Sequence, residues 1–499
     1  MGNLLSKSKP QALPTVATDT IVPMHHMDDS PINRSIVLTF MMRFDDVLDP
    51  EKLKDSLEKL LSRDGWRKLG ARIRLNEKGK LDYHIPESFD EKRPAFGFSH
   101  VKYDVEIGKH PLASRLPKAS SKPAVVGDPG DFASLMRRED GPTSIDDYIY
   151  RDEPQLSLHI VSFTDATLVN LSWPHTFLDA MGRRELLQTW TAVLDGRDGD
   201  VKPLLGVYDD PLKDFGRGPQ QPYMLEQFAL TGWKLAVFGL RFVADLVWYP
   251  TEETRIVCLP AAHMQKLRAD AMADLEAQHK GDGKKPFVSD GDLVSGWITR
   301  LAVQQLESPN STRAIHIMNA FGLRSLLAND LLPSDSAYIA NAVAGVWAMA
   351  PAKDILNKPL SFIASEIRRS IAEQGERGQL EARYAIQRTI LETTGQQSLF
   401  GEPGMRMVII SNWTKGRFFE SDFSAAVVKP GIAKDSPELS STKVGRPSYI
   451  QVVGYSTGNL PSRNAFPIIG KDNAGNYWIS GALRKGLWDR IEDVLNQSE

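Results

Sequence analysis

The chain has 499 residues, of which 41% are hydrophobic and 25% are charged, a composition typical of a globular enzyme. Its net charge of -3 and its pI near 6.4 give no electrostatic reason to expect a nucleic-acid partner. The lone cysteine, Cys258, cannot cross-link the chain, and residues 1–20 lack the continuous apolar core of a secretory signal, so we expect a protein of the reducing cytoplasm. No stretch of the sequence has the roughly 18–20 uncharged apolar residues of a membrane span.

The first seven residues, MGNLLSK, fit the N-myristoylation pattern, with Gly2 exposed once Met1 is removed and Ser6 in place. A polar tail that matches by chance is the alternative. Because one such acyl chain gives only marginal membrane binding, the pattern predicts at most weak membrane association.

The first third of the chain mixes strands with helices. The branched apolar run Ile36–Phe44 predicts a buried strand, and Leu81–Ile85 predicts another. Between them, Asp49-Pro50 provides an N-cap and a first-turn proline for an amphipathic helix over 50–63. Residues 110–155 are rich in Pro, Gly, Asp and Ser and are expected to form loop with short elements.

Two apolar runs, Leu156–Val161 and Thr167–Trp173, predict a strand hairpin. Pro174 interrupts the second strand, and a helix is expected over Phe177–Leu194. His175 therefore lies at a strand-to-helix turn, a position at which functional sites are commonly built.

Residues 209–223 are rich in glycine and proline and predict a linker. The next segment, Met224–Tyr249, predicts a long apolar helix whose few polar side chains share one narrow stripe. This pattern predicts burial between two domains, with shallow membrane contact as the alternative.

The second half of the chain repeats the mixture of strands and helices. Helices are expected at Ala261–Gln278, Asp290–Leu306 and Leu483–Leu495, strands at Arg255–Leu259, Ala314–Phe321, Met407–Asn412 and Ile450–Tyr455, and a hairpin turn at 472–475. We therefore predict an α/β chain with an N-terminal domain over 1–215, a linker and crossover helix over 216–250, and a C-terminal domain over 251–499.

The pattern His-x-x-x-Asp occurs three times, at His25 to Asp29, His100 to Asp104 and His175 to Asp179. With ten histidines a chance match is expected, so the context must separate them. His25 precedes a proline-containing loop and His100 is expected to face solvent, whereas His175 alone stands between a strong strand and a strong helix. A neutral imidazole there could take the proton of an alcohol as it attacks a thioester carbonyl; the alternative is a satisfied core histidine.

A rival motif, GYSTG at residues 454–458, matches the G-x-S-x-G elbow of serine hydrolases. No helix pattern follows it, and that class places its catalytic histidine after the serine, whereas the last histidine here is His316. We therefore interpret the motif as a strand end and a turn. The sequence contains neither a phosphate-binding G-x-x-x-x-G-K-[ST] loop nor a G-x-G-x-x-G after a strand, so nucleotide phosphate chemistry is unsupported.

Two segments together resemble the BAHD family of acyl-CoA-dependent acyltransferases, whose members carry H-x-x-x-D-G and, near the end, D-F-G-W-G. Residues 175–182 read HTFLDAMG, and residues 411–424 read SNWTKGRFFESDFS, with the family's nine-residue step from Trp413 to Asp422. The stretch Phe321–Arg324 resembles the family's arginine-bearing segment. The displaced Gly182 and the altered tail of the second motif are departures, and they are typical of the family's fungal members.

The resemblance implies two similar domains, each a mixed sheet flanked by helices as in chloramphenicol acetyltransferase, with an active-site channel at their interface. It implies that acyl-CoA is the co-substrate and that His175 is the general base. Ser411 would donate a hydrogen bond to the developing oxyanion, and Trp413 would line the substrate site. No metal and no tightly bound cofactor are expected.

The resemblance also assigns structural roles. Asp179 would form an ion pair with Arg324, and Asp422 would support local packing. The sequence alone suggests that Asp179 lies one turn into the helix, from where it could brace the turn behind His175.

Fungal members of the family modify specialised metabolites, so the resemblance favours O-acetylation of a terpenoid, polyketide or alkaloid hydroxyl by a monomeric enzyme. The alternatives are an N-acyltransferase and a non-catalytic ligand-binding or scaffold relative. The presence of His175, Ser411 and Trp413 argues against the non-catalytic alternative.

Overall fold

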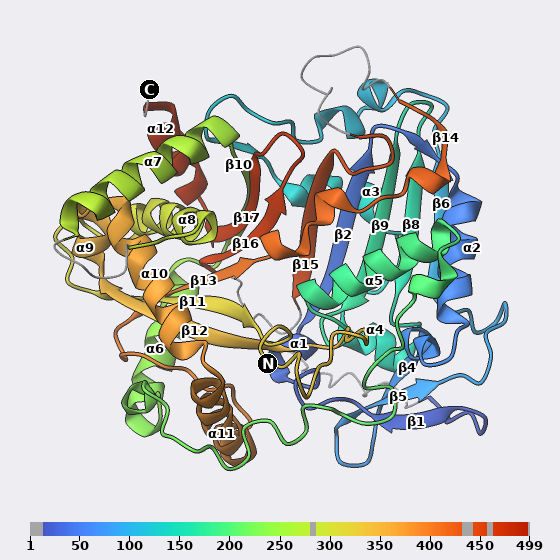
Figure 1. The fold of residues 1–499 in the computed structure, drawn as a ribbon, viewed down its shortest axis with the longest axis horizontal. Coiled ribbons are helices and arrows are strands. Elements are labelled where there is room, and N and C mark those ends of the chain that lie inside the picture. The colour runs from blue at the N-terminus through green and yellow to red at the C-terminus, as the bar shows by residue number, and fades with distance from the viewer. Residues whose placement is uncertain (1–12, 280–285, 432–442, 457–462, 498–499) are drawn as a thin grey trace, which may run out of the picture.

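The computed structural model describes residues 13–279, 286–431, 443–456 and 463–497. Two mixed β-sheets form the two halves of the molecule, and helices pack on each sheet (Figure 1). The α/β architecture predicted from the sequence is confirmed. The segment 1–12, which carries the acylation pattern, lies outside the described residues.

The five-stranded sheet contains the strand that leads to His175. In spatial order its strands are β15 (Tyr449–Ser456), β2 (Ile36–Phe44), β9 (Thr167–Pro174), β8 (Ser157–Ser162) and β6 (Gly97–Lys102). β6 runs parallel to β8 and the other neighbours are antiparallel. Two small sheets lie outside it, one of β1 (Thr20–Pro23), β5 (Leu81–Ile85) and β4 (Arg72–Leu75), the other of β14 (Val427–Lys429) and β3 (Val47–Leu48).

The seven-stranded sheet forms the other half. In spatial order its strands are β12 (Val343–Pro351), β11 (Ala314–Gly322), β13 (Arg406–Asn412), β16 (Ala465–Lys471), β17 (Tyr477–Arg484), β10 (Glu252–Leu259) and β7 (Ala124–Gly127). β11, β13 and β16 run parallel, and the others are antiparallel. The hairpin turn predicted at 472–475 joins β16 to β17.

Each sheet takes one strand from the opposite end of the chain. β15, late in the sequence, pairs along β2, and β7, early in the sequence, pairs along β10. Figure 1 shows the red-orange β15 beside the blue β2 at the centre of the molecule. The exchange interlocks the two halves, so each sheet depends on segments from both sides of the segment 216–250.

The helices cover these sheets. Their bounds are α1 (Pro31–Arg34), α2 (Pro50–Leu61), α3 (Ala133–Met136), α4 (Ile145–Tyr150), α5 (Ala180–Leu194), α6 (Gly232–Trp248), α7 (Ala261–Gln278), α8 (Asp290–Leu306), α9 (Ala352–Asn357), α10 (Leu360–Gln374), α11 (Arg377–Thr394) and α12 (Leu487–Gln497). Leucines spaced along α2 enter the core of the five-stranded sheet, and Asp49 caps that helix as predicted. The buried apolar residues of α8 and α12 pack in the core of the seven-stranded sheet.

Two predicted helices begin later than the sequence indicates. α5 starts at Ala180 rather than at Phe177, because the Asp179 side chain accepts a hydrogen bond from the Gly182 N–H at 2.7 Å and caps the helix. Asp179 is therefore the N-cap and does not lie one turn inside the helix. α12 starts at Leu487 because β17 remains paired with β10 as far as Arg484.

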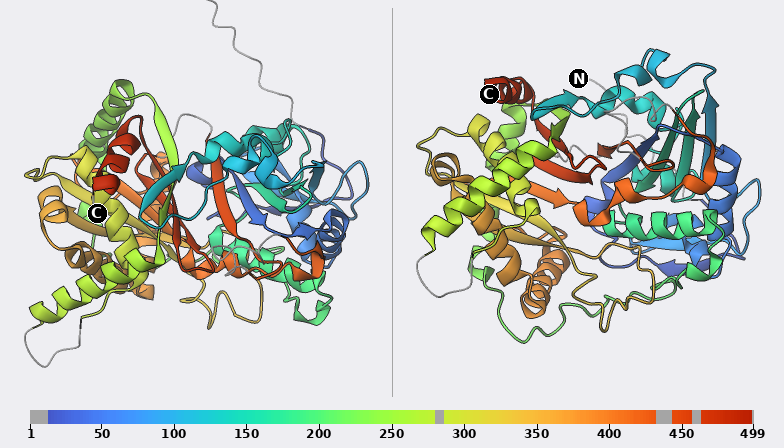
Figure 2. Two further views of the ribbon diagram at one scale, coloured as in Figure 1. Left: turned by 90° about the horizontal axis from the view of Figure 1, so that it is seen from above. Right: turned by 45° about the horizontal axis from the view of Figure 1, so that its top comes forward.

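The expectation for the segment 224–249 is wrong in both extent and environment. The helix begins only at Gly232, because the main chain before it pairs with another segment, with the Leu230 N–H donating to the Leu399 carbonyl at 2.8 Å. None of the residues of α6 is buried, so this helix is not enclosed between domains. It lies at the edge of the molecule, as the green helix in the left view of Figure 2 shows.

Candidate active site

The main chain of His175 is fixed from two sides. Pro174 ends β9 opposite Val37 of β2, and the next N–H, that of His175, donates to the Ile36 carbonyl at 2.8 Å. The His175 carbonyl accepts a hydrogen bond from the Asn341 side-chain amide at 2.9 Å. The sheet and the segment around Asn341 therefore hold the turn in place together.

The carboxylate of Asp179 ties this turn to the other half of the molecule. One oxygen caps α5, and the other accepts hydrogen bonds from Arg324 and from the Ala342 N–H, both at 2.9 Å. Arg324 also donates to the carbonyls of Tyr338 and Ala340 at 2.9 and 2.7 Å. The side chains of Asp179 and Arg324 are 4% and 16% exposed, so the contact is largely shielded from water.

Gly182 stands where the segment 338–342 crosses the start of α5. A Cβ atom built at this glycine would lie 1.8 Å from the Ile339 carbonyl oxygen, a separation that no side chain tolerates. The glycine three residues after Asp179 therefore serves a close approach of two backbones. This approach gives a physical reason for a glycine at this displaced position of the first motif.

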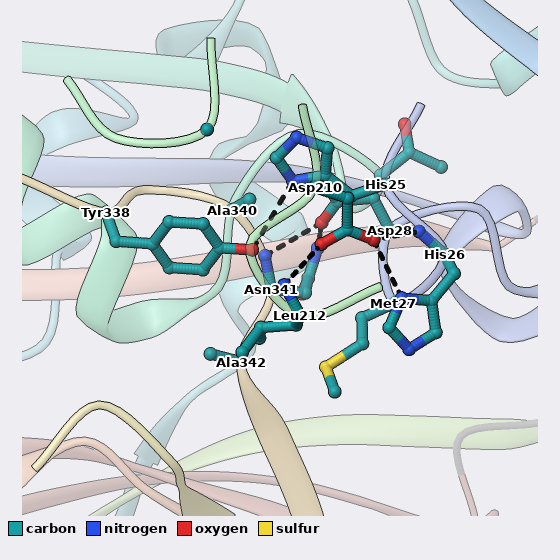
Figure 3. A network of polar contacts seen from close by, with 12 residues as sticks. His25, His26, Met27, Asp28, Asp210, Leu212, Tyr338, Ala340, Asn341 and Ala342 are labelled. Atoms are coloured by element: carbon teal, nitrogen blue, oxygen red, sulfur yellow. Dashed lines mark hydrogen bonds and ion pairs between the residues drawn. The ribbon is translucent and has the colours of Figure 1, made fainter. Parts of the chain in front are cut away.

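A second buried carboxylate, Asp28, holds the segment 338–342 from its other side. The main-chain N–H and the side-chain amide of Asn341 both donate to Asp28, at 2.8 and 2.7 Å. Figure 3 shows these two side chains directed toward one another, with His25 and Tyr338 alongside. Asn341 thus bridges the Asp28 carboxylate and the His175 carbonyl. Burial raises the pKa of Asp28 to about 7.

Arg183, one turn into α5, is a buried cation held by aromatic rings. Its guanidinium lies 4.0 Å from the ring centroid of Phe40, 4.3 Å from that of Phe418 and 4.6 Å from that of Trp413, and the residue is 1% exposed. Two of its nitrogens, Nε and one terminal nitrogen, find no hydrogen-bond partner among the described residues. Burial lowers the pKa of Arg183 to about 9, and cation–π contacts take the place of hydrogen bonds.

Ser411 and Trp413 contact each other at the end of β13. The Trp413 indole N–H donates to the Ser411 hydroxyl oxygen at 2.8 Å, and the Trp413 ring stacks on Arg183. Because the hydroxyl accepts from Trp413, its own proton is directed elsewhere and can be donated. Asp422 lies apart from this group, half exposed, where it accepts from the Ser424 N–H at 3.0 Å.

The imidazole of His175 is in a setting that favours its neutral form. Burial lowers the pKa of His175, and the nearby Arg183 cation lowers it further. Opposing contributions come from the His175 carbonyl, Asp179 and Asn341. A neutral imidazole on a rigid turn can accept a proton at neutral pH.

The other sequence candidates lie elsewhere. His100 is exposed on β6, as predicted, whereas His25 is buried beside Lys68. Ser456 of the G-x-S-x-G match ends β15, and the next two residues of that match lie outside the described part of the chain. Within the described residues, we find no group of three or more His, Cys, Asp and Glu side chains able to hold a metal, and no helix long and apolar enough to cross a membrane.

Comparison with known proteins identifies the family. A model of the Transferase family matches residues 142–429, more than half of the chain, so the protein belongs to that family and is an acyltransferase of the BAHD type, as the sequence motifs indicate.

The chain is similar to fungal proteins along its whole length. It is 47% identical to "Transcriptional regulator calD" of Penicillium decumbens, over 100% of this chain and 99% of that protein. It is 41% identical to "Acetyltransferase sphE" of Aspergillus fumigatus, over 97% of this chain and 96% of that protein. The solved structure of F. sporotrichioides TRI101 with coenzyme A and T-2 shares the fold, with a TM-score of 0.64 at 14% identity over 95% of this chain and 97% of that one.

Proposed function

We propose that the protein transfers an acyl group, with acetyl favoured, from acyl-CoA to a hydroxyl of a terpenoid, polyketide or alkaloid, with His175 as the general base. The observation that carries the proposal is the His175 turn, a histidine with a lowered pKa whose main chain is held by the sheet on one side and by Asn341 on the other. Release of coenzyme A thiol from acetyl-CoA, dependent on a hydroxylated acceptor, tests it.

The proposed reaction proceeds in two steps between the two halves of the molecule. In the first, His175 takes the acceptor's hydroxyl proton as that oxygen attacks the thioester carbonyl, and the carbonyl oxygen becomes an oxyanion that receives a hydrogen bond from Ser411. In the second, the tetrahedral intermediate collapses, the carbon–sulfur bond breaks, and the imidazolium returns its proton to the leaving thiolate. An ester and free coenzyme A result, with no net change of protonation on the enzyme.

The relatives support this choice of chemistry. An acetyltransferase from Aspergillus fumigatus is 41% identical over nearly the whole chain, and F. graminearum TRI101, which shares the fold, has been solved with coenzyme A and T-2 mycotoxin. We propose acyl-CoA as the co-substrate, no tightly bound cofactor, and a monomer acting in the cytoplasm. Acylation of Gly2 remains a proposal, and it would add one weak lipid anchor.

A non-catalytic role is the second candidate, because one relative at 47% identity is named a transcriptional regulator. The net charge of -3 argues against direct DNA binding, which needs a basic surface. Acceptor-dependent thiol release would exclude a purely regulatory protein. If an amine but no alcohol supported turnover, the enzyme would be an N-acyltransferase.

Replacing Ser411 by alanine should lower kcat by roughly 10²-fold while leaving KM for acyl-CoA almost unchanged, because the hydroxyl would act only on the oxyanion. Steady-state kinetics on the purified variant measures both constants. Ser424→Ala, an exposed serine of the same segment, is the matched control and should keep wild-type kcat. A raised KM at constant kcat would show instead that Ser411 binds substrate and does not stabilise the oxyanion.

The pH dependence of kcat should reflect the buried imidazole. The base is active when neutral, and burial lowers its pKa, so the acid limb of the kcat profile should have its midpoint below pH 6.5. Arg183→Met removes the neighbouring cation and should move that midpoint upward, and a methionine of similar length can fill the aromatic site. The Arg184→Met variant, which changes the next residue of α5, should leave the midpoint in place. An unchanged midpoint in Arg183→Met would contradict the electrostatic coupling.

A further inference from the structure

The buried guanidinium of Arg183 has no counter-charge of its own. Burial lowers the pKa of Arg183, and Asp179, the carboxylate that opposes this fall, forms its ion pair with Arg324 instead. Among the described residues no ion pair includes Arg183, and its Nε and one terminal nitrogen have no hydrogen-bond partner. Because burying an unpaired charge costs free energy, residues that break this rule are expected mainly at functional sites.

Arg183 lies where aromatic rings from both halves of the molecule meet. Phe40 and Trp173 belong to β2 and β9 of the five-stranded sheet, and their ring centroids are 4.0 and 5.5 Å from the guanidinium carbon. Trp413 and Phe418 follow β13 of the seven-stranded sheet, and their ring centroids are 4.6 and 4.3 Å from the same carbon. The cation is therefore held by cation–π contacts that link the segment after β13 to the five-stranded sheet.

Trp413 connects this cation with the proposed oxyanion donor. Its indole ring contacts the guanidinium of Arg183, and its indole N–H donates to the Ser411 hydroxyl oxygen at 2.8 Å. A cation over the ring attracts its electron density, which makes the N–H a stronger hydrogen-bond donor. A stronger bond to the Ser411 oxygen polarises the Ser411 O–H in turn, because hydrogen bonds in a chain reinforce one another.

We propose that Arg183 is a positioning residue that acts through Trp413 on the Ser411 hydroxyl, so that this hydroxyl stabilises the developing oxyanion more strongly. Ser411 has this role only within the proposed function, on which the inference rests. Arg183 follows directly after the first motif, residues 175–182, and belongs to neither motif. Its effect through Ser411 is separate from its effect on the pKa of His175, so it should persist at a pH at which the imidazole is fully neutral.

Steady-state kinetics at about pH 8, where burial keeps the imidazole of His175 neutral, tests the proposal. Arg183→Met should lower kcat about tenfold with KM for acyl-CoA nearly unchanged, a smaller loss than removal of the oxyanion donor itself causes. Arg183→Lys keeps the charge and should recover part of this loss. Arg183→Met/Ser411→Ala should be about as fast as Ser411→Ala alone, because the cation acts only through this hydroxyl.

The NMR signal of the Trp413 indole N–H measures the same chain of contacts without turnover. In protein with isotope-labelled tryptophan, this signal is the one that Trp413→Phe removes. Arg183→Met should shift it upfield, because the hydrogen bond to the serine weakens. Arg383→Met is the matched control, since Arg383 is also buried and its guanidinium lies 5.6 and 5.8 Å from the rings of Tyr384 and Phe400. It should leave both kcat and the Trp413 signal unchanged.

Two outcomes would overturn the proposal. Additive losses in Arg183→Met/Ser411→Ala would show that Arg183 acts independently of Ser411, and an unchanged Trp413 signal in Arg183→Met would show that the cation does not act on the indole. If the wild type released no thiol with any acceptor, the proposed function would fail, and the Trp413 signal would still decide whether Arg183 acts on this bond. Thermal unfolding checks the fold of each variant, and Arg183→Gln replaces Arg183→Met in both measurements if the methionine variant unfolds.

Discussion

His175→Ala should lower kcat by about 10²- to 10⁴-fold, the contribution that a positioned general base commonly makes. The loss should fall on kcat, with binding of acyl-CoA nearly unchanged, because the imidazole acts on the acceptor's proton. The main-chain bonds of His175 to Ile36 and Asn341 do not involve the side chain, so the fold should survive the substitution. Steady-state kinetics and thermal unfolding on the same preparation separate the two effects.

His100→Ala is the matched control, because His100 belongs to the same His-x-x-x-Asp pattern but is exposed on β6. It should keep wild-type kcat. A fully active His175→Ala enzyme, or an equal loss in both variants, would show that the imidazole at 175 is not the base.

Breaking the Asp179–Arg324 pair should have the largest effect on stability. Removing one partner of a buried ion pair leaves an uncompensated charge and costs about 3–5 kcal/mol. Asp179→Asn and Arg324→Met should each lower the free energy of unfolding by roughly this amount, with activity lost through unfolding. The double variant should be much less destabilised than the sum, because both changes break the same 2.9 Å contact. Chemical denaturation of the four proteins gives this coupling energy.

An exposed ion pair provides the control for the comparison of the single and double variants. Arg377 and Asp330 form a pair whose side chains are 43% and 40% exposed, so Arg377→Met should cost less than about 1 kcal/mol. Additive losses for Asp179 and Arg324 would show that the two do not interact. An Asp179→Asn enzyme that is stable but inactive would make Asp179 a direct partner of His175 instead.

Much of the fold could be predicted because local patterns and tertiary packing agree. The strand Ile36–Phe44 and the helices Ala261–Gln278 and Asp290–Leu306 have the predicted bounds. A branched apolar run marks the strand, and the Ser289 side chain caps the second helix. The exchange of β7 and β15 between the sheets could not be predicted. Strand pairing depends on contacts far apart in the sequence, and no local pattern records them.

The same distinction applies to the site. The segments that carry His175, Ser411 and Trp413 were found because each motif is a short local pattern. Asp28 and Asn341 were missed because their effect on His175 depends on contacts across 313 and 166 positions of the chain. The burial of Arg183 could have been predicted from the sequence. It lies three, four and seven residues before Leu186, Leu187 and Trp190, on the face of α5 that packs in the core.

The error at α6 has a different origin. A broad apolar face predicts a covered helix, but the sequence does not say what covers it. The structure shows that no other part of the described chain buries this helix. Only the folded chain shows that this apolar face is exposed.

The most direct measurement of the central claim is acceptor-dependent release of coenzyme A thiol from acetyl-CoA, with mass spectrometry of the product. A panel of hydroxylated terpenoids, polyketides and alkaloids would be offered to the wild type and to His175→Ala. We expect the wild type to release thiol and form an acetyl ester with at least one acceptor, and His175→Ala to be at least about 10²-fold slower with that same acceptor. An acetyl ester formed equally fast by both proteins would contradict the account.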